Sequence, residues 1–150
     1  MEYMLMPLRR YAEFSGRSRR MEYWMFALLN AIVSAVLGGL MVAGGFTLPT
    51  MDGSAVAPQA PGLLFWIGGG LLALWVLAVI VPGIAVGVRR LHDRDMSGWW
   101  YLGFILLSMI PVVGIIASIA MIVIFLLPGT AGPNKYGPDP KGGEGMPATV

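Results

Sequence analysis

Three long stretches of the chain contain no charged residue, and they constrain its fold more than any other feature. They run over residues 24–46, 62–88 and 99–127, and are 23, 27 and 29 residues long. A helix needs about 20 mainly apolar residues to cross the hydrocarbon core of a bilayer. We therefore expect an all-α, polytopic membrane protein with about three transmembrane helices.

The composition agrees with this interpretation. Of the 150 residues, 57% are hydrophobic and 12% are charged, whereas a soluble domain carries roughly 25% charged residues. The length predicts one membrane domain over residues 1–140, and the glycine-rich residues 141–150 are expected to form a flexible tail. Because the chain has no cysteine, disulfides, thiolate metal sites and cysteine nucleophiles are excluded.

The third stretch allows two topologies, because Pro111 and Gly114 interrupt it. A single kinked crossing is favoured, since irregular backbone at membrane depth needs protein or water around it. In the alternative, residues 110–114 make a turn between two half-length helices that enter the bilayer and return. The two topologies place the carboxyl terminus on opposite sides of the membrane.

The arginines predict the orientation of the chain. All eight lie within residues 9–20 and 89–94, and the loop at residues 47–61 has no lysine or arginine. Short cytoplasmic loops carry an excess of basic residues. We therefore expect the amino terminus and residues 89–98 in the cytoplasm.

The amino-terminal segment has the pattern of a short interfacial helix. Its expected apolar face is Leu5, Leu8, Tyr11, Ala12 and Phe14. Arginines and an acidic residue lie opposite, which is the arrangement of a helix in the membrane surface. An irregular segment that only orients the protein is the alternative.

The two arginine clusters are the candidate binding residues. Guanidinium groups bind phosphate through paired hydrogen bonds, and basic clusters beside apolar stretches are typical of a membrane surface rather than of nucleic acid. The predicted site comprises Arg17, Arg19, Arg20, Arg89, Arg90, His92, Asp93 and Arg94. We expect it to bind anionic lipid headgroups or a protein partner, and we expect no nucleic-acid binding.

His92 and Asp93 also allow a catalytic alternative, because a histidine beside an aspartate can act as an oriented general base. That alternative is a lipid-headgroup enzyme. No metal-ligand cluster or phosphate-binding glycine loop accompanies the pair, so the sequence predicts no catalytic residue, no metal and no cofactor.

Small residues predict how the helices pack. Ala31, Ala35, Gly39 and Ala43 recur every four positions, and Gly83 and Gly87 form a second pair. Such spacing lets helix backbones approach closely, within one chain or between copies in a homo-oligomer. The glycine-rich second stretch therefore also allows a small oligomeric channel or transporter, although no ionisable residue lies within the stretches.

Three polar blocks together give a resemblance to a known family. They are FSGRSRRMEYW at residues 14–24, RRLHD with SGWW at residues 89–100, and PGT leading to NKYGPDP at residues 128–140. In order and spacing they resemble the domain-of-unknown-function family 805 of small bacterial inner-membrane proteins. The resemblance implies an inner-membrane helical bundle and brings no reaction or ligand. Its residues in the tail are Asn134, Tyr136, Gly137 and Asp139.

The resemblance also bears on topology. If the three blocks form one site, the tail must lie on the same side as the amino terminus. That consequence conflicts with a single crossing by residues 99–127, which would place the tail on the opposite side.

Overall fold

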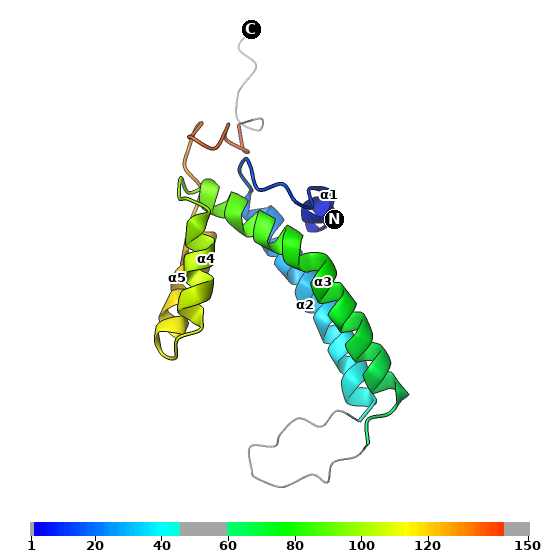
Figure 1. Ribbon diagram of the computed structural model, residues 1–150. Helices are drawn as coiled ribbons and strands as arrows, with labels where there is room; N and C mark the ends of the chain where they lie inside the picture. The colour runs from blue at the N-terminus through cyan, green and yellow to red at the C-terminus, as the bar shows by residue number, and fades with distance from the viewer. Residues whose placement is uncertain (1, 46–59, 143–150) are drawn as a thin grey trace. The chain divides into compact units, whose positions relative to one another are not determined.

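The computed structural model describes residues 2–45 and 60–142, and within them the fold is all-helical, as the sequence predicts (Figure 1). The elements in chain order are α1 (Glu2–Arg9), α2 (Arg20–Ala43), α3 (Leu63–His92), α4 (Trp99–Ser108) and α5 (Val113–Leu126). One isolated bridge joins Asn134 to Gly137. Most of the predicted loop at 47–61 and of the predicted tail at 141–150 lies outside the described residues.

The helices α2 and α3 correspond to the first two uncharged stretches. They contain 24 and 30 residues, which is about 36 and 45 Å at the helical rise of about 1.5 Å per residue. Both exceed the hydrocarbon thickness of about 30 Å. Helix α3 ends in basic residues, which suit the negative end of its dipole.

The chain forms two compact units. The helix-pair unit is Leu28–Ile80 and contains most of α2 and α3. The cap unit is Met1–Ala27 together with Val81–Val150, and contains α1, α4, α5 and the remaining turns of α2 and α3.

In the helix-pair unit, the two backbones approach closely at Gly68. A Cβ atom at this position would lie 2.9 Å from the Leu37 carbonyl oxygen and 3.0 Å from Cγ of Met41. The indole Nε1 of Trp75 also donates a hydrogen bond to Oδ1 of Asn30 at 3.2 Å. The contact therefore combines backbone approach with one polar pair, which is how helices associate in lipid.

The small-residue stripe predicted for α2 lies on another face. Ala35 and Gly39 are exposed, and a Cβ atom at Gly39 would meet nothing within 4 Å. Of the two alternatives for this stripe, packing within one chain is not seen at Gly39 among the described residues. A contact between copies through it stays a prediction.

Residues 99–127 form a helical hairpin, so the favoured single crossing is wrong and the alternative of two half-length helices is correct (Figure 1). Helices α4 and α5 have 10 and 14 residues, about 15 and 21 Å, and they pack against each other. Proline disfavours helical backbone in the residue before it. The residue after Pro111, Val112, has a φ of +67°, which ends any continuous helix here.

The turn of the hairpin satisfies its own backbone groups, which removes the objection to irregular structure at this position. The Gly114 amide donates to the Ile110 carbonyl at 2.7 Å, and the Val113 amide donates to the Pro111 carbonyl at 2.8 Å. A Cβ atom at Gly114 would lie 2.5 Å from the Ser108 carbonyl oxygen. Glycine is therefore required where the two helices meet.

The amino-terminal helix α1 is shorter than the predicted apolar face. It ends at Arg9, so Tyr11 and Phe14 lie beyond it. Pro7 lies inside the helix and is buried.

Candidate functional site

Asp93 lies at the centre of the cap unit and joins all three polar blocks. It directly follows the last residue of α3 and is buried, with 4% of its surface exposed. Its Oδ1 accepts a hydrogen bond from Nε of Arg17 at 2.9 Å, and its Oδ2 accepts one from Arg90. Its backbone carbonyl accepts the Thr130 amide at 2.8 Å. The hairpin therefore returns the chain to the end of α3.

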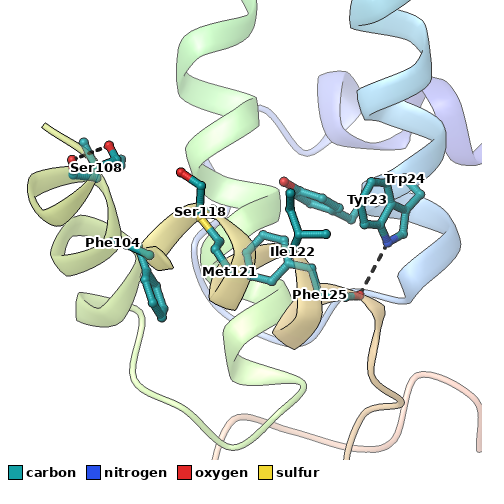
Figure 2. A pocket seen from close by; sticks show the side chains of 10 residues that line it. Tyr23, Trp24, Phe104, Ser108, Ser118, Met121, Ile122 and Phe125 are labelled. Carbon is teal, nitrogen blue, oxygen red and sulfur yellow. Dashed lines mark hydrogen bonds between the residues drawn. The ribbon is translucent and has the colours of Figure 1, made fainter. Parts of the chain in front are cut away.

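Arg90 caps the carboxyl end of α5. The last four carbonyl groups of a helix have no partner within it, and a cation is favoured there. Nε and Nη2 of Arg90 donate to the Phe125 carbonyl at 3.2 and 3.1 Å, and Nη2 also donates to Leu127. Trp24 donates to the same Phe125 carbonyl at 3.4 Å, as Figure 2 shows. Arg90 thus joins the ends of α3 and α5.

Two more arginines bind carbonyl groups at the exit of α5. Arg20 donates to the Leu126 carbonyl at 3.2 Å, and Arg94 donates to the Pro128 carbonyl at 2.5 Å. Arg20 is exposed and Arg94 is half-buried. Nε of Arg94 is buried and has no hydrogen-bond partner among the described residues. Because these acceptors are carbonyl groups, neither arginine forms an ion pair with a carboxylate among the described residues.

A second buried ion pair ties the start of α2 to the end of α3. Nη1 of Arg89 lies 3.0 Å from Oε1 of Glu22, and both side chains are buried. Oε2 of Glu22 accepts a hydrogen bond from the Ser18 hydroxyl at 2.7 Å. The Ser18 amide donates to the Arg89 carbonyl at 3.2 Å. Two buried charges lose their hydration, so such a pair stabilises only with good geometry and added hydrogen bonds.

Arginines of the amino-terminal block hold the tail. Nη1 of Arg17 donates to the Gly132 carbonyl and Nη2 to the Thr130 carbonyl, each at 2.6 Å. Nε of Arg19 donates to the Pro140 carbonyl at 2.7 Å. The amino-terminal segment and residues 128–142 therefore contact each other within the cap unit.

The predicted tail residues form a folded turn on the end of α3. Nδ2 of Asn134 donates to the His92 carbonyl at 2.9 Å. The Tyr136 ring stacks on the His92 ring, with 3.8 Å between centroids and 4° between planes. Gly137 has a φ of +138°, in the region that favours glycine. The NKYGPDP block is therefore ordered around His92.

Asp139 closes the same tail segment. Its carboxylate accepts hydrogen bonds from the Lys141 amide at 2.9 Å and from the Gly132 amide at 3.1 Å. These amide donors, first that of Lys141, lower the pKa of Asp139 from its ordinary value. The carboxylate is therefore held in its charged form.

His92 does not pair with Asp93, so the dyad required by the catalytic alternative is not formed. Nδ1 of His92 lies 3.2 Å from the Gly16 carbonyl oxygen, while the Asp93 carboxylate binds two arginines. A carbonyl oxygen can only accept, so Nδ1 carries the proton in the neutral ring and Nε2 is an acceptor. The histidine is a positioned hydrogen-bonding group without an adjacent acid.

Two of the apolar cavities within the cap unit adjoin the candidate site. The larger has a volume of about 560 Å³ and is lined by residues of α3, α4, the segment before α2 and the tail. The smaller, about 200 Å³, lies among α4, α5 and the start of α2 (Figure 2). Two polar groups that line the smaller cavity are bonded within the protein, since the Ser108 hydroxyl donates to the Ile105 carbonyl and Trp24 donates to the Phe125 carbonyl.

The structure brings the predicted site residues together but does not expose all of them. Arg17, Arg89 and Arg90 are buried, and the binding of headgroups or of a protein partner by this set of residues stays a prediction. Among the predicted packing glycines, Gly87 lies close to α4, because a Cβ atom there would lie 2.3 Å from the Tyr101 ring. A Cβ atom at Gly83 would meet nothing within 4 Å.

Sequence reasoning missed three groups of residues and atoms. Glu22 was not identified as the partner of Arg89, although it is the one acid within the first polar block, at residues 14–24. Thr130 was noted only as part of a family motif. The carbonyl groups at the exit of α5 have no signal in the sequence, because every residue has one.

Comparisons with known proteins match this chain over most of its length. The family model described as "Protein of unknown function (DUF805)" matches residues 11–138. The inner membrane protein YhaI of Escherichia coli K12 is 38% identical over 143 residues, covering 95% of this chain and 98% of the relative. The inner membrane protein YhaH of the same strain is 39% identical over 142 residues, covering 94% and 98%. No solved structure matches.

Proposed function

The chain belongs to the DUF805 family and is an inner-membrane protein, and we propose that its cap unit binds anionic lipid headgroups at the cytoplasmic face without catalysing a reaction. The observation that carries this proposal is the state of Arg20 and Arg94. Both keep their positive charge, because they donate to carbonyl groups rather than to carboxylates. Guanidinium groups at headgroup depth attract anionic phosphate groups.

The buried arginines have a different role in this proposal. Arg17, Arg89 and Arg90 each face a carboxylate. Asp93 is shared by two of them, so the group of Arg17, Asp93 and Arg90 carries a net charge of +1. This charge adds to the positive potential around Arg20 and Arg94, while the buried contacts hold the surface in shape.

The buried Nε of Arg94 supports a phosphate ligand. A buried donor without a partner costs about 1–3 kcal/mol, and such groups usually meet water or a ligand. A phosphate oxygen is a strong acceptor for a guanidinium. Arg94 therefore has one bond to the protein, at Pro128, and a further donor suited to a headgroup.

The experiment compares stabilisation by lipid in the full-length protein. Purified protein in nanodiscs should have a higher melting temperature with phosphatidylglycerol than with phosphatidylcholine. The double variant Arg20→Gln with Arg94→Gln should lose most of this difference, because each basic group near an anionic surface contributes about 1 kcal/mol.

The variant Arg10→Gln is a matched control. It removes one positive charge, but Arg10 is paired with Glu13 at 2.6 Å. The control should therefore keep the preference for phosphatidylglycerol. An equal loss in control and double variant, or equal stabilisation by the two lipids, would contradict the proposal.

The cytoplasmic orientation is tested separately. The chain has no cysteine, so single cysteines can report the side of the membrane. In intact cells, an impermeant maleimide should label Asp52→Cys in the arginine-free loop. It should label Lys135→Cys, in the tail, only after the membrane is permeabilised. The reverse pattern would place the cap unit outside.

The channel alternative has no specific observation in its favour. The amide of Asn30, which lies in the uncharged part of α2, is engaged by Trp75.

A further inference from the structure

The cavity lined by α3, α4, the segment before α2 and the tail changes in chemistry along its length. Its polar lining residues, His92, Ser97 and Tyr136, lie in or next to the segment that joins α3 to α4, or in the tail. Ile84 and Ile105 line it farther from that segment along the two helices. Ile84 precedes His92 by eight residues, which is about 12 Å of helix. The cavity is therefore polar toward the α3–α4 connection and apolar toward the hydrocarbon side.

His92 offers an acceptor within this lining. Its ring is held on one side by Tyr136 and by the bond between Nδ1 and the Gly16 carbonyl. That bond makes Nε2 the unprotonated nitrogen of the neutral ring. A ligand group that donates a hydrogen bond therefore fits here.

Among the described residues, no charged side chain lines the cavity. The large apolar residues that line it are left open, with Trp99 78% and Leu102 46% exposed. Its volume of about 560 Å³ falls within the range of about 300–1,000 Å³ for small-molecule sites. Aromatic residues such as Trp99 and Tyr101 are typical of the membrane–water interface. An uncharged amphiphile placed there has its head at the polar lining and its chain in the apolar part.

We propose that this cavity binds one chain of an uncharged membrane amphiphile whose hydroxyl headgroup donates a hydrogen bond to Nε2 of His92. The site is separate from the cations assigned to anionic headgroups, so it does not depend on the proposed function. It has the two parts of a lipid site, a polar end with a defined acceptor and an apolar wall between α3 and α4.

The test uses three probes that share the same acyl chain and differ in their headgroup. They are monoolein, which has hydroxyl donors, methyl oleate, which has none, and oleic acid, which is anionic when ionised. Binding to the full-length protein in detergent is measured by native mass spectrometry. Monoolein should bind at one saturable site about five- to tenfold more tightly than methyl oleate, the effect of one hydrogen bond. Tighter binding of oleic acid than of monoolein would contradict the proposal that the ligand has an uncharged headgroup.

Two variants locate the site. Leu102→Trp fills the cavity from α4 and should weaken monoolein binding at least about tenfold. Leu106→Trp lies on the same helix, is also exposed, and does not line the cavity, so it should leave binding unchanged. If Leu102→Trp changes the oligomeric state and leaves monoolein binding intact, a second copy covers this face and the proposal is wrong.

His92→Phe separates the headgroup contact from the chain contact. Phenylalanine keeps an aromatic ring beside Tyr136 but has no acceptor. Monoolein binding should fall to the level of methyl oleate, and methyl oleate binding should not change. If His92→Phe weakens the binding of monoolein and methyl oleate equally, at an unchanged melting temperature, Nε2 does not have the role assigned to it.

Discussion

The cap unit and the helix-pair unit hold their helices together by different means. In the helix-pair unit, α2 and α3 approach at Gly68, and one hydrogen bond joins Trp75 to Asn30. In the cap unit, buried arginines join carboxylates and the carbonyl groups at the end of α5. The helix-pair unit therefore relies mainly on close backbone packing, and the cap unit relies on ion pairs and hydrogen bonds made by arginines.

The difference follows from the length of the helices. A helix that crosses the bilayer satisfies its backbone within itself and can pair by close approach alone. The short helix α5 ends close to the end of α3, where its last carbonyl groups need partners. Arginine supplies five donors in a fixed geometry, so one side chain can satisfy several carbonyl groups. The cap unit is therefore expected to respond to charge changes and the helix-pair unit to changes in volume.

The largest effect is expected for Asp93→Asn. It removes the carboxylate shared by Arg17 and Arg90 and leaves two buried guanidinium groups without an acid. Breaking a buried ion pair costs about 3–5 kcal/mol, so the protein should unfold at much lower denaturant in micelles. The control is Asp95→Asn, since Asp95 is exposed and lies 3.7 Å from Lys135. It should change stability by less than about 1 kcal/mol. Similar effects of the two variants would refute the central position of Asp93.

Next in size are two glycine substitutions, one in each unit. Gly87→Ala places a methyl group against the Tyr101 ring, and Gly68→Ala places one against Leu37 and Met41. Overpacking costs about 1–3 kcal/mol, measured as a lower melting temperature. Gly83→Ala and Gly70→Ala are the controls, because a Cβ atom there would meet nothing within 4 Å. These controls should be neutral or stabilising by up to about 1 kcal/mol. If Gly87→Ala and Gly83→Ala behave alike, the contact of Gly87 with α4 is not significant.

A smaller effect is expected for Trp75→Phe. It removes the indole donor to Asn30 while keeping an aromatic ring. Hydrogen bonds between membrane helices average about 0.6 kcal/mol, so the unfolding free energy should fall by less than about 1 kcal/mol. A loss as large as that of Asp93→Asn would show that polar contacts hold the helix-pair unit as well.

The smallest effect is the pH dependence of the tail. The pKa of Asp139 is lowered by the amides of Lys141 and Gly132. A lowered pKa in the folded state stabilises the tail above the ordinary value of 3.8, and this contribution is lost as the pH falls through the lowered pKa. Titration of the Asp139 carboxyl ¹³C signal should give a lower midpoint in the folded protein than in denaturant. Equal midpoints would mean that the two amide bonds are not formed in solution.

Local sequence patterns were sufficient to predict several features of the fold. The length and hydropathy of residues 24–46 and 62–88 predict α2 and α3, because one long apolar helix needs no partner to satisfy its backbone. The three polar blocks identify the residues that form the cap unit. The interruption at Pro111 and Gly114 marks the hairpin turn, although it does not by itself distinguish a kink from a reversal.

The uncharged stretches by themselves determined that this chain is a helical membrane protein, since only the length and composition of a segment decide whether it can enter the bilayer. Tertiary structure decided that residues 99–127 turn back, because the turn closes its own hydrogen bonds. It also decided which arginines are buried. Arg90 and Arg94 are four residues apart, yet one binds Asp93 and the end of α5 and the other keeps an uncompensated charge. Their difference depends on atoms of α5 and the tail that are distant in the sequence.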